Sequence, residues 1–85
     1  MSQREKAKQR LAATPTPTDY RYSEARTLLS GLGFEEDTSA AGSRIRWYRA
    51  SDQRSIILHK PHPGDEMCFA AVRALAAFLK EAGDL

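Results

Sequence analysis

Residues 43–60 have the sequence SRIRWYRASDQRSIILHK, and this stretch decides the fold. Apolar and polar residues alternate in it twice, over residues 43–49 and again over residues 54–60. Alternation of this kind is typical of a strand with one buried face, because successive side chains of a strand point to opposite faces. The polar residues 50–53 between the two runs form a loop. The stretch therefore predicts a β-hairpin.

One face of this hairpin is apolar and the other is basic. Ile45 and Trp47 share a face of the first strand, and we expect Trp47 to anchor the core because it is in phase with Ile45. Ile56 and Leu58 continue that face in the second strand. The opposite face is expected to carry Arg44, Arg46, Tyr48, Ser55, Ile57 and His59.

A helix and a short strand are predicted upstream of the hairpin. Apolar residues at positions 25, 28, 29 and 32 fall on one helical face. Ser23 is expected to cap this helix at its beginning, and Gly33 to end it. A short strand then begins at Phe34 and fades between residues 37 and 40.

A second helix is predicted downstream of the hairpin. The prolines of residues 61–64 end the preceding strand, because proline cannot donate to a strand ladder. Apolar residues then recur at helical spacing as far as position 82. Asp65 and Glu66 are expected at the start of this helix, where acidic side chains favour the helix dipole, and Gly83 follows its end.

The order helix, three strands, helix predicts an α+β fold. Two helices would cover one face of a three-stranded antiparallel sheet. Residues 19–85 are expected to form this domain. Residues 1–18 are predicted to be a mobile basic arm with a net charge of +3, because residues 12–18 have the sequence AATPTPT, which favours extended backbone. A solvated tail and an electrostatic contact with RNA are the two interpretations of this arm.

Composition limits the class of protein. The chain has 85 residues, enough for a single small domain. Cys68 is the only cysteine, which excludes an internal disulfide and a cysteine-based zinc site. No apolar run is long enough to span a bilayer, and the N-terminus lacks the apolar stretch of a secretory signal. We therefore expect a cytoplasmic protein without a membrane partner, and neither a cofactor nor a metal site.

The net charge of +2 hides an uneven distribution. Residues 43–60 hold five basic residues against one acid, a net of +4. Residues 23–37 have a net of −3 and residues 61–85 a net of −2. This pattern predicts a localised basic surface on the hairpin, suited to the phosphates of RNA. The residues expected to bind RNA are Ser43, Arg44, Arg46 and Lys60.

Several short motifs resemble the HicA toxin family. They are Leu28-Leu29, Gly33-Phe34, Gly42-Ser43, Pro61-His62-Pro63 and the run FLKEAG at residues 78–83. The resemblance covers roughly residues 22–85. It implies a fold like that of a double-stranded-RNA-binding domain, cleavage of mRNA, and neutralisation by a HicB antitoxin.

The sequence departs from the family at one important position. Members of the family typically have Gly-Ser-His at the start of this strand, with the histidine catalytic, whereas this chain has Gly42-Ser43-Arg44. Arginine stays protonated near neutral pH and cannot act as a general base. It can bind a phosphate with two hydrogen bonds and stabilise developing negative charge. The catalytic role of the family histidine therefore does not pass to Arg44.

Metal-independent RNA cleavage needs a base, an acid and a cation at the reacting phosphate. Histidine suits the first two roles, and the chain has only His59 and His62. We hypothesise that His59 or His62 is the acid/base residue and that Arg44 stabilises charge. The alternatives are a catalytically inactive RNA-binding domain and a module that only binds an antitoxin, both on the same fold.

Overall fold

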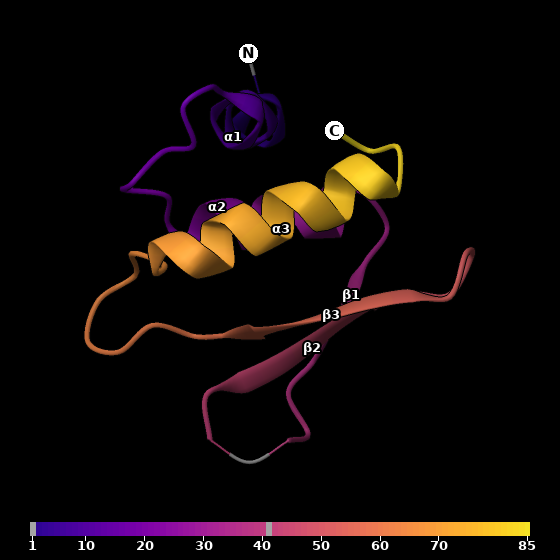
Figure 1. Cartoon of the computed structure of the whole chain (residues 1–85). Coiled ribbons are helices and arrows are strands. Elements are labelled where there is room, and N and C mark those ends of the chain that lie inside the picture. The colour runs from indigo at the N-terminus through magenta and orange to yellow at the C-terminus, as the bar shows by residue number, and fades with distance from the viewer. Residues whose placement is uncertain (1, 41) are drawn as a thin grey trace.

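A three-stranded antiparallel sheet in the order β1-β2-β3 carries two helices on one face, α2 and α3 (Figure 1). The computed structural model describes residues 2–40 and 42–85. In chain order the elements are α1 (Gln3–Ala12), α2 (Tyr22–Gly31), β1 (Glu35–Asp37), β2 (Arg44–Arg49), β3 (Arg54–His59) and α3 (Phe69–Glu81). The predicted α+β class and the placement of two helices on one face of the sheet are confirmed. No helix within the described residues is long and apolar enough to cross a membrane.

The hairpin has the predicted faces, and the structure gives its register. Ile45 lies opposite Leu58, and Trp47 lies opposite Ile56. Pairing continues one step beyond β3, where the backbone N–H of Lys60 donates to the Ser43 carbonyl at 2.8 Å. The first strand is shorter than predicted, since β1 contains only three residues.

The core lies between the apolar face of the hairpin and the helices. Trp47 is 1% exposed, as predicted, and its indole Nε1 donates to the Tyr22 hydroxyl at 3.3 Å. That hydroxyl donates in turn to a Glu36 carboxylate oxygen at 3.2 Å, so both polar atoms of the buried aromatic pair have partners. Burial raises the pKa of the Tyr22 phenol. The helices contribute Tyr22, Ala25, Leu28, Leu29, Val72, Leu75 and Leu79 to this core.

The beginning of α2 differs from the prediction. Arg21, not Ser23, occupies the N-cap position of this helix. The Glu24 carboxylate accepts the backbone N–H of Arg21 at 3.2 Å, and the Asp65 carboxylate accepts the backbone N–H of Ser23 at 3.2 Å. The first turn is therefore satisfied by a side chain from 42 positions further along the chain.

Asp65 and Glu66 do not begin the last helix, which starts at Phe69. Instead they belong to a segment that pairs with the chain just before α2. The Met67 N–H donates to the Tyr20 carbonyl at 2.9 Å, and the Tyr22 N–H donates to the Asp65 carbonyl at 2.7 Å. These inter-segment bonds use the backbone groups that a longer helix would need, so α3 begins later than its acidic residues suggest.

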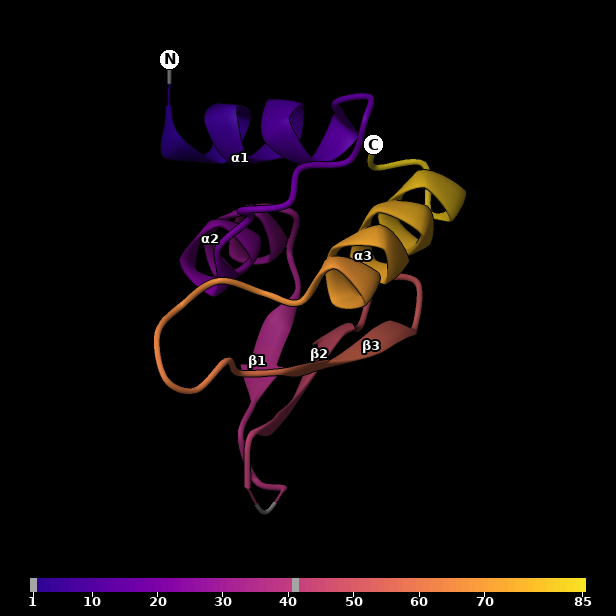
Figure 2. The ribbon, with the colours of Figure 1, turned by 60° about the vertical axis from the view of Figure 1, so that its left-hand side comes forward.

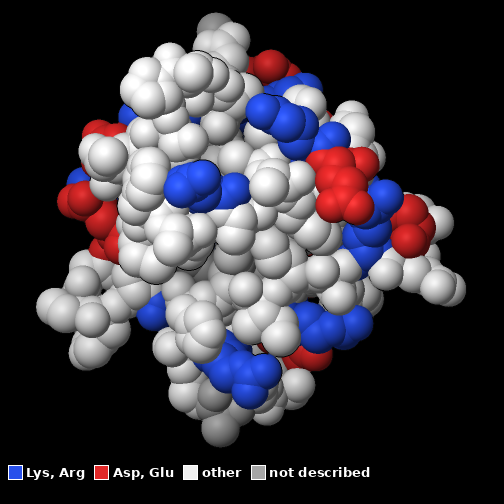
Figure 3. Space-filling model, viewed as in Figure 1, with Lys and Arg blue, Asp and Glu red and all other residues white. Residues whose placement is uncertain are grey.

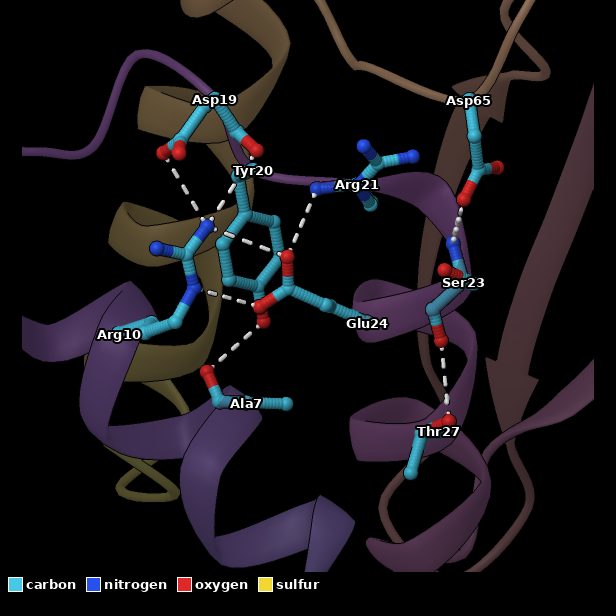
Figure 4. A network of polar contacts seen from close by, with 9 residues as sticks. All are labelled: Ala7, Arg10, Asp19, Tyr20, Arg21, Ser23, Glu24, Thr27 and Asp65. Carbon is cyan, nitrogen blue, oxygen red and sulfur yellow. Dashed lines mark hydrogen bonds and ion pairs between the residues drawn. The ribbon is translucent and has the colours of Figure 1, made fainter.

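The predicted mobile arm is wrong for Gln3–Ala12, which forms helix α1. Figure 2 shows α1 lying across α2, on the side away from the sheet. Ala7 and Leu11, four positions apart, are each 2% exposed and belong to the core. The Tyr20 hydroxyl donates to the Ala7 carbonyl at 2.8 Å (Figure 4). Tertiary contacts thus stabilise a helix whose own sequence is almost entirely polar. Residues 13–18, predicted to be extended, lie outside every helix and strand.

Candidate nucleic-acid interface

The open face of the sheet places Arg44 and His59 side by side. The two residues are direct partners in the β2–β3 register. Because Lys60 bonds to Ser43, and hydrogen-bonded pairs alternate with non-hydrogen-bonded pairs, Arg44 and His59 form a non-hydrogen-bonded pair. Side chains approach most closely in such pairs, with Cβ atoms about 4.5–5.5 Å apart. Both side chains are exposed.

Arg46 occupies the next position on the same face. Its guanidinium carbon lies 5.1 Å from the centre of the Tyr48 ring, the distance of a cation–π contact. Asp37 faces Arg46 from β1. The Ser39 hydrogen bonds, among them the backbone N–H at 2.9 Å, lower the pKa of the Asp37 carboxyl, with a smaller effect from the charge of Arg46. The Tyr48 ring therefore holds Arg46 along the sheet, and the Asp37 carboxylate on the neighbouring strand forms no ion pair with it.

Two shallow hollows flank the exposed side chain of Ile57. One has a volume of about 210 Å³ and is lined by residues that include Arg44, Arg46 and Asp37. The other has a volume of about 430 Å³, lies between β3 and α3, and contains His59, Lys60 and His62. Ile57 lines both hollows. The structure thus brings Arg44 next to His59, and His59 next to Lys60 and His62, but places Arg44 and His62 in different hollows.

Two of the five basic residues of the hairpin form ion pairs within the protein, and Arg54 keeps 37% of its side chain exposed in its pair. Arg49 forms ion pairs with Asp52 at 2.7 Å and Asp84 at 2.8 Å. Its hydrogen bonds to Asp52 and then Asp84 raise the pKa of the Arg49 guanidinium above its ordinary value. Arg54 also contacts Asp52, at 3.4 Å. The net charge of +4 counted along the sequence therefore overstates the basic surface that is open to a ligand.

Three basic residues of the hairpin remain without an ion pair to any residue among 2–40 and 42–85. They are Arg44, Arg46 and Lys60. These three are among the residues that the sequence predicts to bind RNA. The fourth, Ser43, is exposed at the end of the same ladder. Figure 3 shows basic surface at the lower, sheet end of the molecule, with a smaller acidic patch beside it.

Tyr48 is an aromatic residue of the open face that is not among the residues predicted to bind RNA. It is half-buried on the open face, two positions from Arg46, with its ring against that guanidinium. The neighbouring Glu35 carboxylate raises the pKa of the Tyr48 phenol. The alternation of β2 already places Tyr48 on the same face as Arg44 and Arg46. An aromatic residue beside two arginines on one strand face is a pattern that could have indicated a base-stacking contact from the sequence alone.

Other polar residues of the sheet end have partners within the fold. Glu36 accepts hydrogen bonds from Tyr22 and from Arg26, the latter at 3.3 Å. Cys68 is exposed at the N-cap of α3. Among the described residues, no three His, Cys, Asp or Glu side chains are grouped as a metal site would require.

One comparison with known proteins gives a match. A family model described as "HicA toxin of bacterial toxin-antitoxin" matches residues 22–83. The matched segment runs from the start of α2 through α3 and leaves α1 outside it. No curated protein and no solved structure matches the chain.

Proposed function

The chain belongs to the HicA family of toxins from bacterial toxin–antitoxin systems, and we propose that it cuts mRNA on the open face of its sheet. The observation that carries this proposal is the exposed, directly paired Arg44 and His59 on a face that also holds Arg46. A HicB-like antitoxin in the cytoplasm would neutralise the activity. The reaction needs no metal ion, because the substrate supplies its own nucleophile.

The proposed reaction is an attack by the ribose 2′-hydroxyl on the adjacent phosphorus. The His59 imidazole removes the proton from this hydroxyl, and the new P–O bond forms as the bond to the 5′ oxygen breaks. The leaving oxygen takes up a proton from an imidazolium or from water. The products are a 2′,3′-cyclic phosphate and a 5′-hydroxyl end.

Arg44 is the proposed stabiliser of the transition state. Its guanidinium can donate two parallel hydrogen bonds to phosphate oxygens, where negative charge accumulates during the attack. Its place directly opposite His59 lets the two groups reach one phosphate from the same face of the sheet. Arg44 thus supplies the positive charge while His59 on the neighbouring strand supplies the base. Arg44 stays protonated throughout the reaction.

The position of His59 favours it over His62 as the acid/base residue. His59 is fixed by the β2–β3 ladder and directly faces Arg44. His62 lies in the loop after β3 and shares a hollow with His59. A catalytic group gains most from a rigid element, because misplacement by about 1 Å costs much of the rate. We therefore assign proton removal to His59.

The rest of the proposed interface binds substrate without reacting. We propose that Arg46 on the open face and Lys60 just beyond the end of β3 contact the phosphates that neighbour the reacting one, and that the Ser43 hydroxyl donates a hydrogen bond to the RNA. Tyr48 offers an aromatic edge to an unstacked base. Such contacts favour single-stranded RNA over a paired helix.

RNA cleavage by histidine variants tests this assignment. We expect His59→Ala to lower the rate of mRNA cleavage by about 100-fold or more, the usual contribution of general acid–base catalysis. The matched variant His62→Ala should stay within a few-fold of the wild type, since its loop position leaves Arg44 and His59 unchanged. The measurement is the rate of appearance of cyclic-phosphate ends on a defined RNA. A larger loss in His62→Ala would transfer the role to His62, and undiminished cleavage in both would remove both histidines from the mechanism.

Arg44 in place of the family histidine supports a second candidate function, RNA binding without cleavage. Expression of the chain in bacteria separates the two. Growth arrest with loss of mRNA supports the ribonuclease, and arrest with intact mRNA supports binding alone. No arrest would leave a module that only binds its antitoxin. Co-expression of the neighbouring reading frame should restore growth if that frame encodes the antitoxin.

A further inference from the structure

The outer edge of β3 presents unpaired backbone groups. The sheet order places β3 at an edge, opposite the short β1. Since Lys60 bonds to Ser43, the alternation of the ladder directs the N–H and C=O groups of residues 54, 56 and 58 toward β2. The groups of Ser55, Ile57 and His59 therefore point outward. None of these three residues makes a backbone hydrogen bond outside the sheet to a described residue.

An apolar groove runs beside this edge. The hollow of about 430 Å³ between β3 and α3 is lined on its apolar sides by Ile56, Pro61, Ala71 and Ala74. Ile57, which also lines it, is 47% exposed. A strand added to β3 would point every second side chain toward this groove and the others toward the open face.

We propose that an extended segment of a partner protein adds to β3 as a fourth strand of the sheet, with small or branched apolar side chains in the groove. The partner segment carries acidic residues opposite Arg54 and Lys60, which lie at the two ends of the edge. Backbone bonds to Ser55, Ile57 and His59 supply affinity, and the groove and the two cations supply specificity.

The charges of the edge argue against a second copy of the chain as occupant. In an antiparallel pair of β3 strands from two copies of the chain, all three outward residues are used only when Ile57 of one copy lies opposite Ile57 of the other. That register places Arg54 of each copy opposite Lys60 of the other, so two like-charge pairs oppose the dimer. Registers centred on Ile56 or Leu58 avoid these pairs but leave one of the three outward residues unused. A partner strand with acids at the same places turns both repulsions into attractions.

A strand bound at this edge would also affect the open face. It would bond to the backbone of His59 and lie beside the Arg44–His59 pair. Partner binding and RNA cleavage would then exclude one another, which is what an antitoxin must achieve. This last step rests on the proposed function, whereas the strand addition itself does not.

Proline at Ile57 tests the strand addition. The Ile57 N–H points away from β2, so Ile57→Pro removes an edge donor and leaves the β2–β3 ladder complete. The control is Ile57→Thr, which keeps the N–H and the branched side chain. The probe is the protein encoded by the neighbouring reading frame. We expect Ile57→Pro to weaken its binding by about 30-fold or more and Ile57→Thr by less than about threefold.

Amide hydrogen exchange gives a second measurement that needs no substitution. In the free chain the N–H groups of Ser55, Ile57 and His59 should exchange much faster than those of Ile56 and Leu58. In the complex the three outward groups should become protected by at least about tenfold.

Three results would overturn the inference. The first is failure of the probe protein to bind the chain. The second is equal affinity of the two Ile57 variants, with the outward amides still exchanging freely in the complex. The third is a dimer of the chain alone that Ile57→Pro dissociates, because a second copy would then occupy the edge. A wild-type chain that binds its partner through the edge but cuts no RNA would refute the proposed function and leave the strand addition standing.

Discussion

The three arginines of β2 differ in their surroundings, because two are exposed on the open face and one makes contacts within the fold. Arg44 and Arg46 are exposed on the open face, whereas the Arg49 side chain is 12% exposed. The Arg49 guanidinium lies 4.5 Å from the centre of the Phe34 ring and donates to the Leu32 carbonyl at 3.1 Å. Together with its two carboxylate partners, these contacts join the end of α2, the hairpin loop and the C-terminal segment.

We expect Arg49→Met to lower the free energy of unfolding by about 2 kcal/mol, because it removes charge-assisted hydrogen bonds that are partly shielded from water and keeps most of the apolar stem. Urea unfolding followed by the fluorescence of Trp47, the single tryptophan, measures this change. The control Arg46→Met should stay within about 0.5 kcal/mol, since surface substitutions seldom do more. Equal effects of the two substitutions would mean that the Arg49 contacts add no stability.

The sequence predicts the positions of Arg44 and His59 but not the partners of Arg49. Alternation fixes which face of the strand a side chain takes, and a hairpin with a short loop fixes which residues oppose each other. Arg49 finds Asp84 across 35 positions of sequence, a pairing that depends on how α3 ends. Counting charges along the chain therefore indicated a basic hairpin. It could not show that Arg49 and Arg54 form ion pairs within the protein.

Helix α1 shows how tertiary contact decides the state of a polar segment. Apart from Ala7 and Leu11, the helix presents little apolar surface, and the following residues include two prolines. Its docking depends on polar contacts from residues just beyond the linker. Arg10 donates to Glu24 at 2.7 Å and also contacts Asp19 at 3.2 Å (Figure 4). Tyr20 adds a buried hydrogen bond to the same helix.

We expect Tyr20→Phe to reduce stability in a manner that depends on pH. Burial raises the pKa of the Tyr20 phenol above its ordinary value. A raised pKa in the folded state means that this stabilisation is complete below about pH 10, the unfolded value, and is lost as the pH rises from there toward the folded value. At pH 7 the variant should lose about 1 kcal/mol with the hydrogen bond to Ala7, and above pH 10 its deficit should shrink.

Urea unfolding at neutral pH and above pH 10 checks this expectation for Tyr20. Tyr48→Phe is the control for the loss at neutral pH, because the Tyr48 phenol lies on the sheet and has no hydrogen bond to α1. Parallel stability curves for the wild type and Tyr20→Phe over this range would contradict the role given to the buried phenol.

Elements with a strong repeating pattern were predicted well, and their ends were not. The hairpin faces and the core side of α3 follow from periodicity alone. Helix α3 starts at Phe69 and not at the predicted Asp65, and the N-cap of α2 is Arg21 and not the predicted Ser23. Both differences arise because residues 65–67 pair with residues 20–22. The same distant pairing supplies the carboxylate that accepts the Ser23 N–H. A contact between residues 42 positions apart cannot be recognised from the sequence around either residue.

At the scale of the whole molecule, the basic residues are divided between two sides. Helix α1 carries Lys6 and Lys8 on the side of α2 that faces away from the sheet, and the open face carries its cations at the other end of the molecule (Figure 1). A single short RNA lying on the sheet would therefore not reach α1. Charge on α1 and charge on the sheet should contribute to RNA binding independently, and only the second should matter at the proposed site.

The salt dependence of RNA binding tests this division. Three unpaired cations, Arg44, Arg46 and Lys60, each release about 0.7–0.9 counterion on contact with a phosphate, so log K should fall with log salt with a slope of about −2 to −3. Lys60→Gln should reduce the magnitude of the slope by about 0.7–0.9, the contribution of one phosphate contact. The double variant Lys6→Gln and Lys8→Gln should leave the slope unchanged. Polarisation of a labelled single-stranded RNA with 2′-O-methyl riboses, which block cleavage, measures the slope. A slope near −4, as five contacts would give, would mean that Arg49 and Arg54 leave their carboxylate partners to bind RNA, and a flat dependence would exclude phosphate contacts by the sheet.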